Sequence, residues 1–174
     1  FLGYQVVSRT IFGITNALSE ATSDAFAFNR EFTRTAQLLS RAGNRVGRGQ
    51  LSSIRQVVNE TATQFGIDAN LLARASSTLA NAGRTVSEVR QIISAVGPAT
   101  LTATFGDLNE QKIGALNSIL VQFKLNVNQT GDVLDSLNAI TKNFNVSIDE
   151  LLTGTQKAGA TFAALSDIQF IDPS

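Results

Sequence analysis

Residues 4–39 read YQVVSRTIFGITNALSEATSDAFAFNREFTRTAQLL, and this stretch decides the fold that the sequence predicts. Its apolar and small residues recur at alternating gaps of three and four, as on a helix with one continuous apolar stripe. One set of stripe positions is Tyr4, Ile11, Leu18, Ala25, Phe32 and Leu39, and the other is Val7, Ile14, Ala21, Phe28 and Thr35. A single helix of this length would measure about 54 Å.

This stripe, called the seam below, indicates contact with other chains, because the remaining sequence is too short to cover it all. Two-stranded coils prefer β-branched residues at the first core position and Leu at the second, whereas Leu18 occupies a first position and Ile14 a second. We therefore expect a trimer or higher assembly; the alternative is a helix that folds back onto its own domain. The expected oligomer contacts are Val7, Ile11, Ile14, Leu18, Ala21, Ala25, Phe28 and Phe32.

Length and charge exclude several classes of protein. The chain has 174 residues, enough for one domain with a core and an extension. Its net charge is zero, but residues 1–95 carry +4 and residues 96–174 carry −4. The chain as a whole therefore has no net charge that would attract it to nucleic acid or to acidic membranes. Cysteine is absent, no apolar run has transmembrane length, and the missing methionine suggests a fragment of something longer.

The sequence predicts an all-α protein, with a long N-terminal coiled-coil-type helix followed by a compact multi-helix domain. We expect an oligomerising helix over 1–42, a glycine- and arginine-rich hinge over 43–51, a helical core domain over 52–165, and an irregular tail over 166–174. The hinges between the later helices are short, so those helices should pack as antiparallel neighbours.

Capping signals and glycines mark the expected helices. Asp107 is expected to cap its helix, Gly97-Pro98 to end the one before it, and Phe123, Ile140 and Phe144 to face the core. The expected starts and ends are Ser52 or Ser53 to Gly66, Asp68 to Gly83, Thr85 to Gly97, Asp107 to Phe123, Thr130 to Phe144, and Ser147 towards Gly159.

One local pattern occurs twice. Phe65-Gly-Ile-Asp68, followed by Leu71-Leu72, resembles Phe144-Asn-Val-Ser147, followed by Leu151-Leu152. In each, an aromatic residue closes a helix, a β-branched residue fills the turn, a cap follows, and paired leucines return to the core. Two copies do not establish a solenoid, but they indicate a pseudo-repeated helical hairpin.

Residues suited to catalysis are scarce. The sequence has neither His nor Cys, which removes the commonest general base and the commonest soft-metal ligands. The acidic pairs Asp107/Glu110, Asp132/Asp135 and Asp149/Glu150 each fall in an expected first helical turn, where a carboxylate offsets the helix dipole. We expect no enzymatic activity, no cofactor and no metal site.

Four arginines, Arg41, Arg45, Arg48 and Arg55, form the one cluster of like charge, with no acidic residue between Glu31 and Glu60. They are candidates for contact with passing double-stranded DNA or with an acidic tube wall. The alternative is a solvated hinge whose arginines help to end the first helix. Aromatic residues do not alternate with these arginines, which argues against stacking on single-stranded nucleic acid.

From about Phe26 onward the chain resembles the tail tape-measure proteins of tailed bacteriophages. The stretches that carry the resemblance are Phe28–Phe32, Thr61–Arg74 with Leu79–Gly83, Pro98–Phe105, and Leu137–Leu152 with Lys157–Gly159. Their order and spacing together are more specific than any one of them. After Leu165 the sequence departs from the family pattern, because the expected helical continuation gives way to Ser166–Ser174.

The resemblance implies a structural protein of the virion. Such proteins lie as several copies in the lumen of the tail tube or at the tail tip, set tail length during assembly, and leave ahead of the DNA. The implied partners are further copies of the chain, tail tube and tail tip proteins, passing double-stranded DNA and, during ejection, the host membrane. A rival interpretation is a membrane-penetrating or channel-forming helical protein that acts at genome delivery. Against it, the first helix carries little Lys or Arg before Arg30.

Overall fold

The computed structural model describes residues 23–41 and 47–168, with side chains up to residue 159. Seven α-helices lie in these ranges, which confirms the all-α prediction. The first covers residues 23–41, and the earlier part of the helix expected over 1–42 lies outside the described residues. The others are α2 (Arg48–Phe65), α3 (Ala69–Asn81), α4 (Val86–Ala99), α5 (Glu110–Gln122), α6 (Thr130–Phe144) and α7 (Ile148–Ile168), with a 3₁₀ turn, η1 (Val127–Gln129), before α6.

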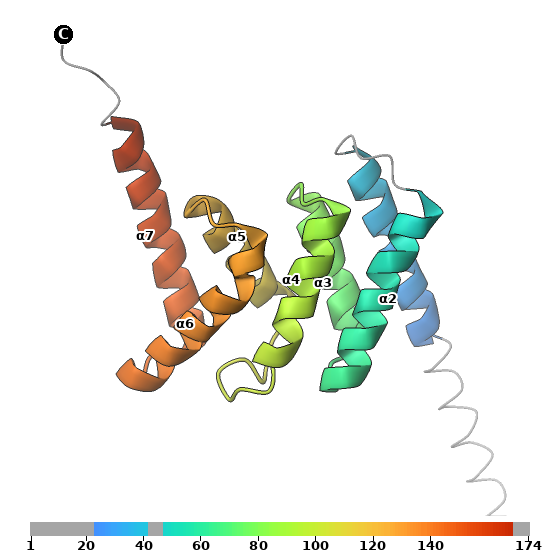
Figure 1. Ribbon diagram of the computed structural model, residues 1–174, viewed down its shortest axis with the longest axis horizontal. Helices are drawn as coiled ribbons and strands as arrows, with labels where there is room; N and C mark the ends of the chain where they lie inside the picture. Colours follow the sequence, from blue (N-terminus) through green and yellow to red (C-terminus); the bar gives the residue numbers. More distant parts are fainter. Residues whose placement is uncertain (1–22, 42–46, 169–174) are drawn as a thin grey trace, which may run out of the picture.

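The helices form two layers. Along the chain each helix packs against the one two places further on: α2 against α4 and α4 against α6, α3 against α5 and α5 against α7. One layer is therefore α2, α4 and α6, and the other is α3, α5 and α7, with the 23–41 helix hydrogen-bonded to α3. Figure 1 shows the helices succeeding one another along the longest axis, from α2 at the right to α7 at the left. Chain order thus becomes position along this axis.

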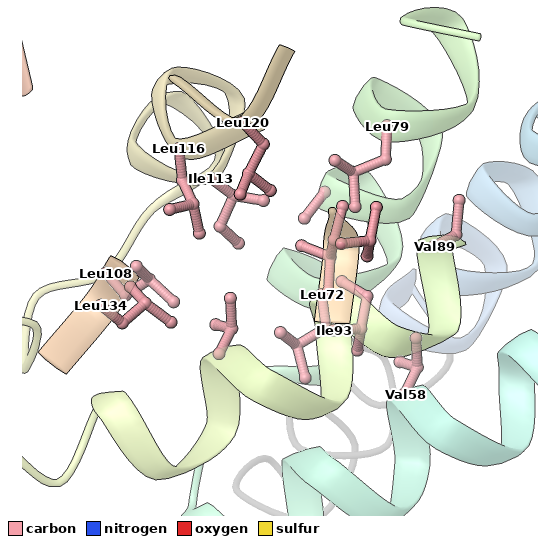
Figure 2. Close-up of a cluster of buried hydrophobic side chains, with 14 of the residues drawn as sticks. Val58, Leu72, Leu79, Val89, Ile93, Leu108, Ile113, Leu116, Leu120 and Leu134 are labelled. Atoms are coloured by element: carbon pink, nitrogen blue, oxygen red, sulfur yellow. The ribbon is translucent and has the colours of Figure 1, made fainter. Parts of the chain in front are cut away.

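The core runs between the two layers. It takes residues from α2 through α7 and from the 23–41 helix. Figure 2 shows Leu72 and Leu79 of α3, Val89 and Ile93 of α4, and Ile113, Leu116 and Leu120 of α5 gathered in this space. Each helix buries one face and leaves a polar face outside, which is the pattern of amphipathic helices that share a core.

Local capping confirms several predicted boundaries. Gly66 ends α2 with φ = 67°, a conformation that suits glycine, and the Asp68 carboxylate accepts a hydrogen bond from the Asn70 N–H at 2.8 Å to open α3. Thr85 and Glu88 form the predicted reciprocal capping box of α4, in which the Thr85 N–H donates to Glu88 Oε2 at 2.8 Å.

Several boundaries differ from the predictions. Helix α7 continues to Ile168, past Gly159 and into the expected irregular tail over 166–174. Helix α2 begins at Arg48, inside the expected hinge, because Gln50 Oε1 accepts a hydrogen bond from the Gly47 N–H and starts the helix earlier. Helix α4 continues through Pro98 to Ala99. Proline in the last turn forfeits only one helical bond, and the preceding Gly97 has no Cβ to clash with the ring.

The cap of α5 is Asn109 and not Asp107. Asn109 Oδ1 accepts a hydrogen bond from the Lys112 N–H at 2.9 Å, whereas the Asp107 carboxylate accepts one from Lys112 Nζ at 2.8 Å. Leu108, which is 8% exposed, enters the core between them. Spacing alone does not choose between Asp107 and Asn109 as the cap.

Two further expectations need correction. A coiled-coil helix that stands apart from the domain is not present in the described ranges, because the 23–41 helix buries Phe32 and Leu39 in the domain's own core. Phe123, Ile140 and Phe144 do not face the core but are 40%, 38% and 72% exposed. For Ile140 and Phe144 the reason is their place in the stack, since no helix beyond α6 extends its layer within the described part of the chain.

Candidate functional site

The described half of the seam packs against the chain's own domain. Phe32 and Leu39 are 1% and 0% exposed, and Phe28 packs beside them. The rings of Phe28 and Phe32 meet edge to face, with centroids 4.8 Å apart. Here the structure shows the alternative arrangement, in which the helix folds back onto its domain. Ala25 is exposed, and Val7, Ile11, Ile14, Leu18 and Ala21 lie outside the described residues.

A polar contact explains the threonine in the seam. Thr35 is fully buried, and its Oγ1 lies 2.8 Å from Ser77 Oγ of α3. The Ser77 hydroxyl also lies 3.1 Å from Glu31 Oε2 and 3.2 Å from the Glu31 carbonyl oxygen. Because buried hydroxyls need partners, these bonds fix the rotation and height of the 23–41 helix on α3.

One arginine of the cluster, Arg55, has partners on another helix. The Arg55 guanidinium lies over the rings of Phe28 and Phe32, 5.8 and 5.0 Å from their centroids, and donates to Asn29 Oδ1 at 2.9 Å. Arg55 therefore ties α2 to the 23–41 helix through cation–π contact and hydrogen bonding. Arg41 and Arg48 are exposed, and Arg45 lies outside the described residues.

A nearly buried lysine, which sequence reasoning missed, joins α5 to α7. The Lys112 side chain is 4% exposed, and its Nζ lies 2.8 Å from Asp107 and 3.7 Å from Asp149. The hydrogen bond from Lys112 holds the pKa of Asp107 below its ordinary value. No local spacing indicates this contact, because Asp149 comes from α7, far along the chain.

Both glutamates of the acidic pairs have structural partners. Glu150 closes the predicted capping box of α7: its Oε2 accepts hydrogen bonds from the Ser147 hydroxyl and N–H, at 2.8 and 3.1 Å, which hold the pKa of Glu150 below its ordinary value. Glu110 accepts a bond from the Thr78 hydroxyl at 2.5 Å and ties α5 to α3. Asp132 lies in the first turn of α6, as predicted, and Asp135 follows it as an exposed residue.

Charged side chains line several hollows of the described surface: Asp107, Lys142 and Asp149 share one, and Asp149, Glu150 and Lys157 share another. An open groove of about 540 Å³ between α2, α4 and η1 has one charged lining residue, Arg90. Among the described residues, no group of three or more acidic side chains could hold a metal ion. None of the described helices is both long enough and apolar enough to cross a membrane. The arrangement thus holds helices together and presents surfaces.

The comparisons with known proteins identify the class. The family model described as phage-related minor tail protein matches residues 55–166, well over half of the chain. The chain belongs to this family, whose domain occurs in tape-measure proteins, and the tail of a virion is therefore its location. Neither a search of curated proteins nor a search of solved structures found a match.

Proposed function

We propose that the chain is part of a tape-measure protein, which lies as several copies in the lumen of the tail tube or at the tail tip, sets tail length, and leaves ahead of the DNA. The single observation that carries the proposal is the family match over residues 55–166, in a domain that occurs in tape-measure proteins. The role is architectural rather than catalytic.

Two structural features support an architectural role. The helices share one continuous core between two layers, and polar contacts such as Thr35–Ser77 and Lys112–Asp107 fix neighbouring elements to one another. The exposed guanidinium-bearing residues Arg41 and Arg48 are the proposed contacts with passing double-stranded DNA or with the tube wall. Further copies of the chain would meet through the seam residues that precede residue 23.

The protein content of whole particles tests the proposed place in the tube lumen. Mass spectrometry should detect the chain in intact virions and find it depleted in particles that have ejected their DNA. The tail tube protein is the internal control, because it should remain at the same level in both. Equal retention of the chain after ejection would contradict a place in the lumen.

The membrane-penetrating alternative can be tested separately. The chain over residues 1–174 should leave dye-filled vesicles of neutral and of anionic lipid intact, because its first helix carries little Lys or Arg before Arg30. Leakage that depends on protein concentration, and that Ile14→Asp abolishes, would favour the alternative and assign the first helix to the membrane.

A further inference from the structure

The two phenylalanines of the pseudo-repeat, Phe65 and Phe144, differ in what covers them. At the end of α2, Phe65 packs so closely on α4 that a Cβ added to Gly97 would lie 2.5 Å from the phenyl ring. Phe144 ends α6 at the matching place in the repeat, and the residues that follow the two phenylalanines, Gly66 and Asn145, both have positive φ, 67° and 51°. Phe65 meets the next helix of its layer, whereas Phe144 is 72% exposed.

The exposed side of α6 forms a stripe, called the α6 end face here. Asp132, Ser136, Ile140 and Phe144 follow one another at intervals of four along the helix and are all exposed. Asp132 at one end of the helix and two apolar side chains at the other make this face both acidic and apolar.

The opposite end of the stack carries a complementary surface. The outward side of the 23–41 helix presents Phe26, which is 71% exposed, together with Arg30 and Arg34. A hollow of about 260 Å³ is lined by Ser23, Phe26, Ala27 and Arg30. We call this side the 23–41 end face. Within the chain, Arg55 already lies over two phenyl rings, so an arginine beside an aromatic ring is a contact this protein uses.

We propose that copies of this chain associate head to tail, with the α6 end face of one copy on the 23–41 end face of the next. The rings of Phe144 and Phe26 would come together beside Arg30, and Asp132 would face the arginines. Chain order is position along the long axis (Figure 1), and the described residues before 96 hold eight Arg and five acidic residues, whereas residues 96–159 hold four Lys and six acidic residues. The two ends therefore carry opposite net charge and attract each other. Such a heterologous contact builds a ring or an open row.

The test uses the full chain with Ile14→Asp and Leu18→Asp, so that the seam cannot contribute. Sedimentation velocity over a concentration series should show reversible association that weakens on the order of tenfold between 0.05 and 0.5 M salt, since salt screens exposed charges. In this background Phe26→Glu and Phe144→Lys should each be monomeric. Leu101→Glu is the matched control, because Leu101 is equally exposed but lies in the loop after α4; it should associate normally.

Mixing two monomeric variants gives the decisive result, with Phe144→Asn in place of Phe144→Lys because a lysine at position 144 would attract the glutamate of Phe26→Glu. Phe26→Glu keeps its α6 end face and Phe144→Asn keeps its 23–41 end face, so an equal mixture should form a dimer and nothing larger. A monomeric parent chain, a mixture that stays monomeric, or association that survives either substitution would overturn the proposal. Circular dichroism verifies folding, and the exposed Arg30→Glu substitution replaces Phe26→Glu if that variant is unfolded. The proposed contact does not depend on the proposed role in the tail. That role is tested separately, by the mass spectrometry of intact and emptied particles.

Discussion

Single residues decide how closely α2 and α4 approach. A Cβ at position 97 would lie 2.5 Å from Phe65 Cδ2 and 2.8 Å from Thr61 Cγ2, both closer than real contacts allow. Glycine at this position is therefore required by packing, although it costs about 1 kcal/mol of helix propensity relative to alanine. The close approach makes this glycine the contact point between two helices of the same layer.

Gly97→Ala is expected to destabilise the domain by about 1–3 kcal/mol, because the added methyl group displaces Phe65 and Thr61. Gly154→Ala in α7 is the matched control: nothing lies within 4 Å of its added Cβ, so it should stabilise by up to about 1 kcal/mol. Urea unfolding measures both. Changes of the same sign in the free energy of unfolding, or an equal cost of Gly97→Ala when Phe65 is already alanine, would contradict this packing.

The buried charge of Lys112 makes a second prediction at this scale. Lys112→Met keeps the apolar stem and removes the charge, so it should change the urea midpoint little. Asp107→Asn leaves the ammonium with only the more distant Asp149 and should lower the midpoint more. The urea midpoint of the variant with both substitutions should be no lower than that of Lys112→Met. A lower midpoint for the double variant would contradict the pairing of Lys112 with Asp107.

The dependence on pH follows from the lowered pKa of Asp107. A carboxyl group whose pKa is lower in the folded state stabilises the fold at any pH above its ordinary pKa. This stabilisation disappears as the pH falls through the pKa of the folded state, below about 4. The difference in the free energy of unfolding between wild type and Asp107→Asn should thus be largest at pH 7 and smaller at pH 3. A difference that grows on acidification would contradict this sign.

At the scale of elements, helix boundaries could be predicted wherever the signal is local. Gly66, Asp68 and the boxes at Thr85 and Ser147 satisfy backbone groups within four residues, so their spacing in the sequence is sufficient. At the start of α5 two local cap signals compete, Asp107 before Glu110 and Asn109 before Lys112, and spacing alone does not choose between them; the structure uses Asn109, with Leu108 buried.

The seam shows the same limit for packing. A stripe with gaps of three and four is identical whether the covering helix belongs to the same chain or to another. For Phe32 and Leu39 the cover is the chain's own domain, and the buried Thr35 hydroxyl has two partners, the Glu31 carbonyl oxygen of its own helix and Ser77 on α3. The partners of Arg55 could not be predicted for a similar reason, since the rings that hold it lie on a helix well before it in the sequence. Sequence thus predicted the elements but not their partners.

The cap of α7 gives the prediction at this scale. Ser147→Ala removes both the hydroxyl that bonds the Glu150 N–H and its bond to Glu150 Oε2, and should cost about 0.5–2 kcal/mol. Ser136→Ala is the matched control, because that exposed hydroxyl only bonds the Asp132 carbonyl oxygen within α6. Thermal or urea unfolding should separate the two, and an equal cost at both positions would argue against the capping role.

At the scale of the whole molecule, the described helices form one stack in which the 23–41 helix is a member rather than an extension. If the protein acts as a ruler, length must then come from residues outside the stack, including the seam that precedes residue 23. Inserting residues into the loop between α4 and α5 should leave tail length unchanged, because that loop lies within the stack.

Tail length across a series of heptad changes tests the proposed tape-measure role most directly. Removing residues 12–18, or duplicating them once, twice and more, keeps the seam in register, because seven residues return each position to its own face. Each heptad in a helix along the tube spans about 10 Å, and several are needed to exceed one ring of tube subunits. Electron microscopy should show tail length rising linearly with heptad number while the insertion between α4 and α5 has no effect; tails of constant length across the series would contradict the role.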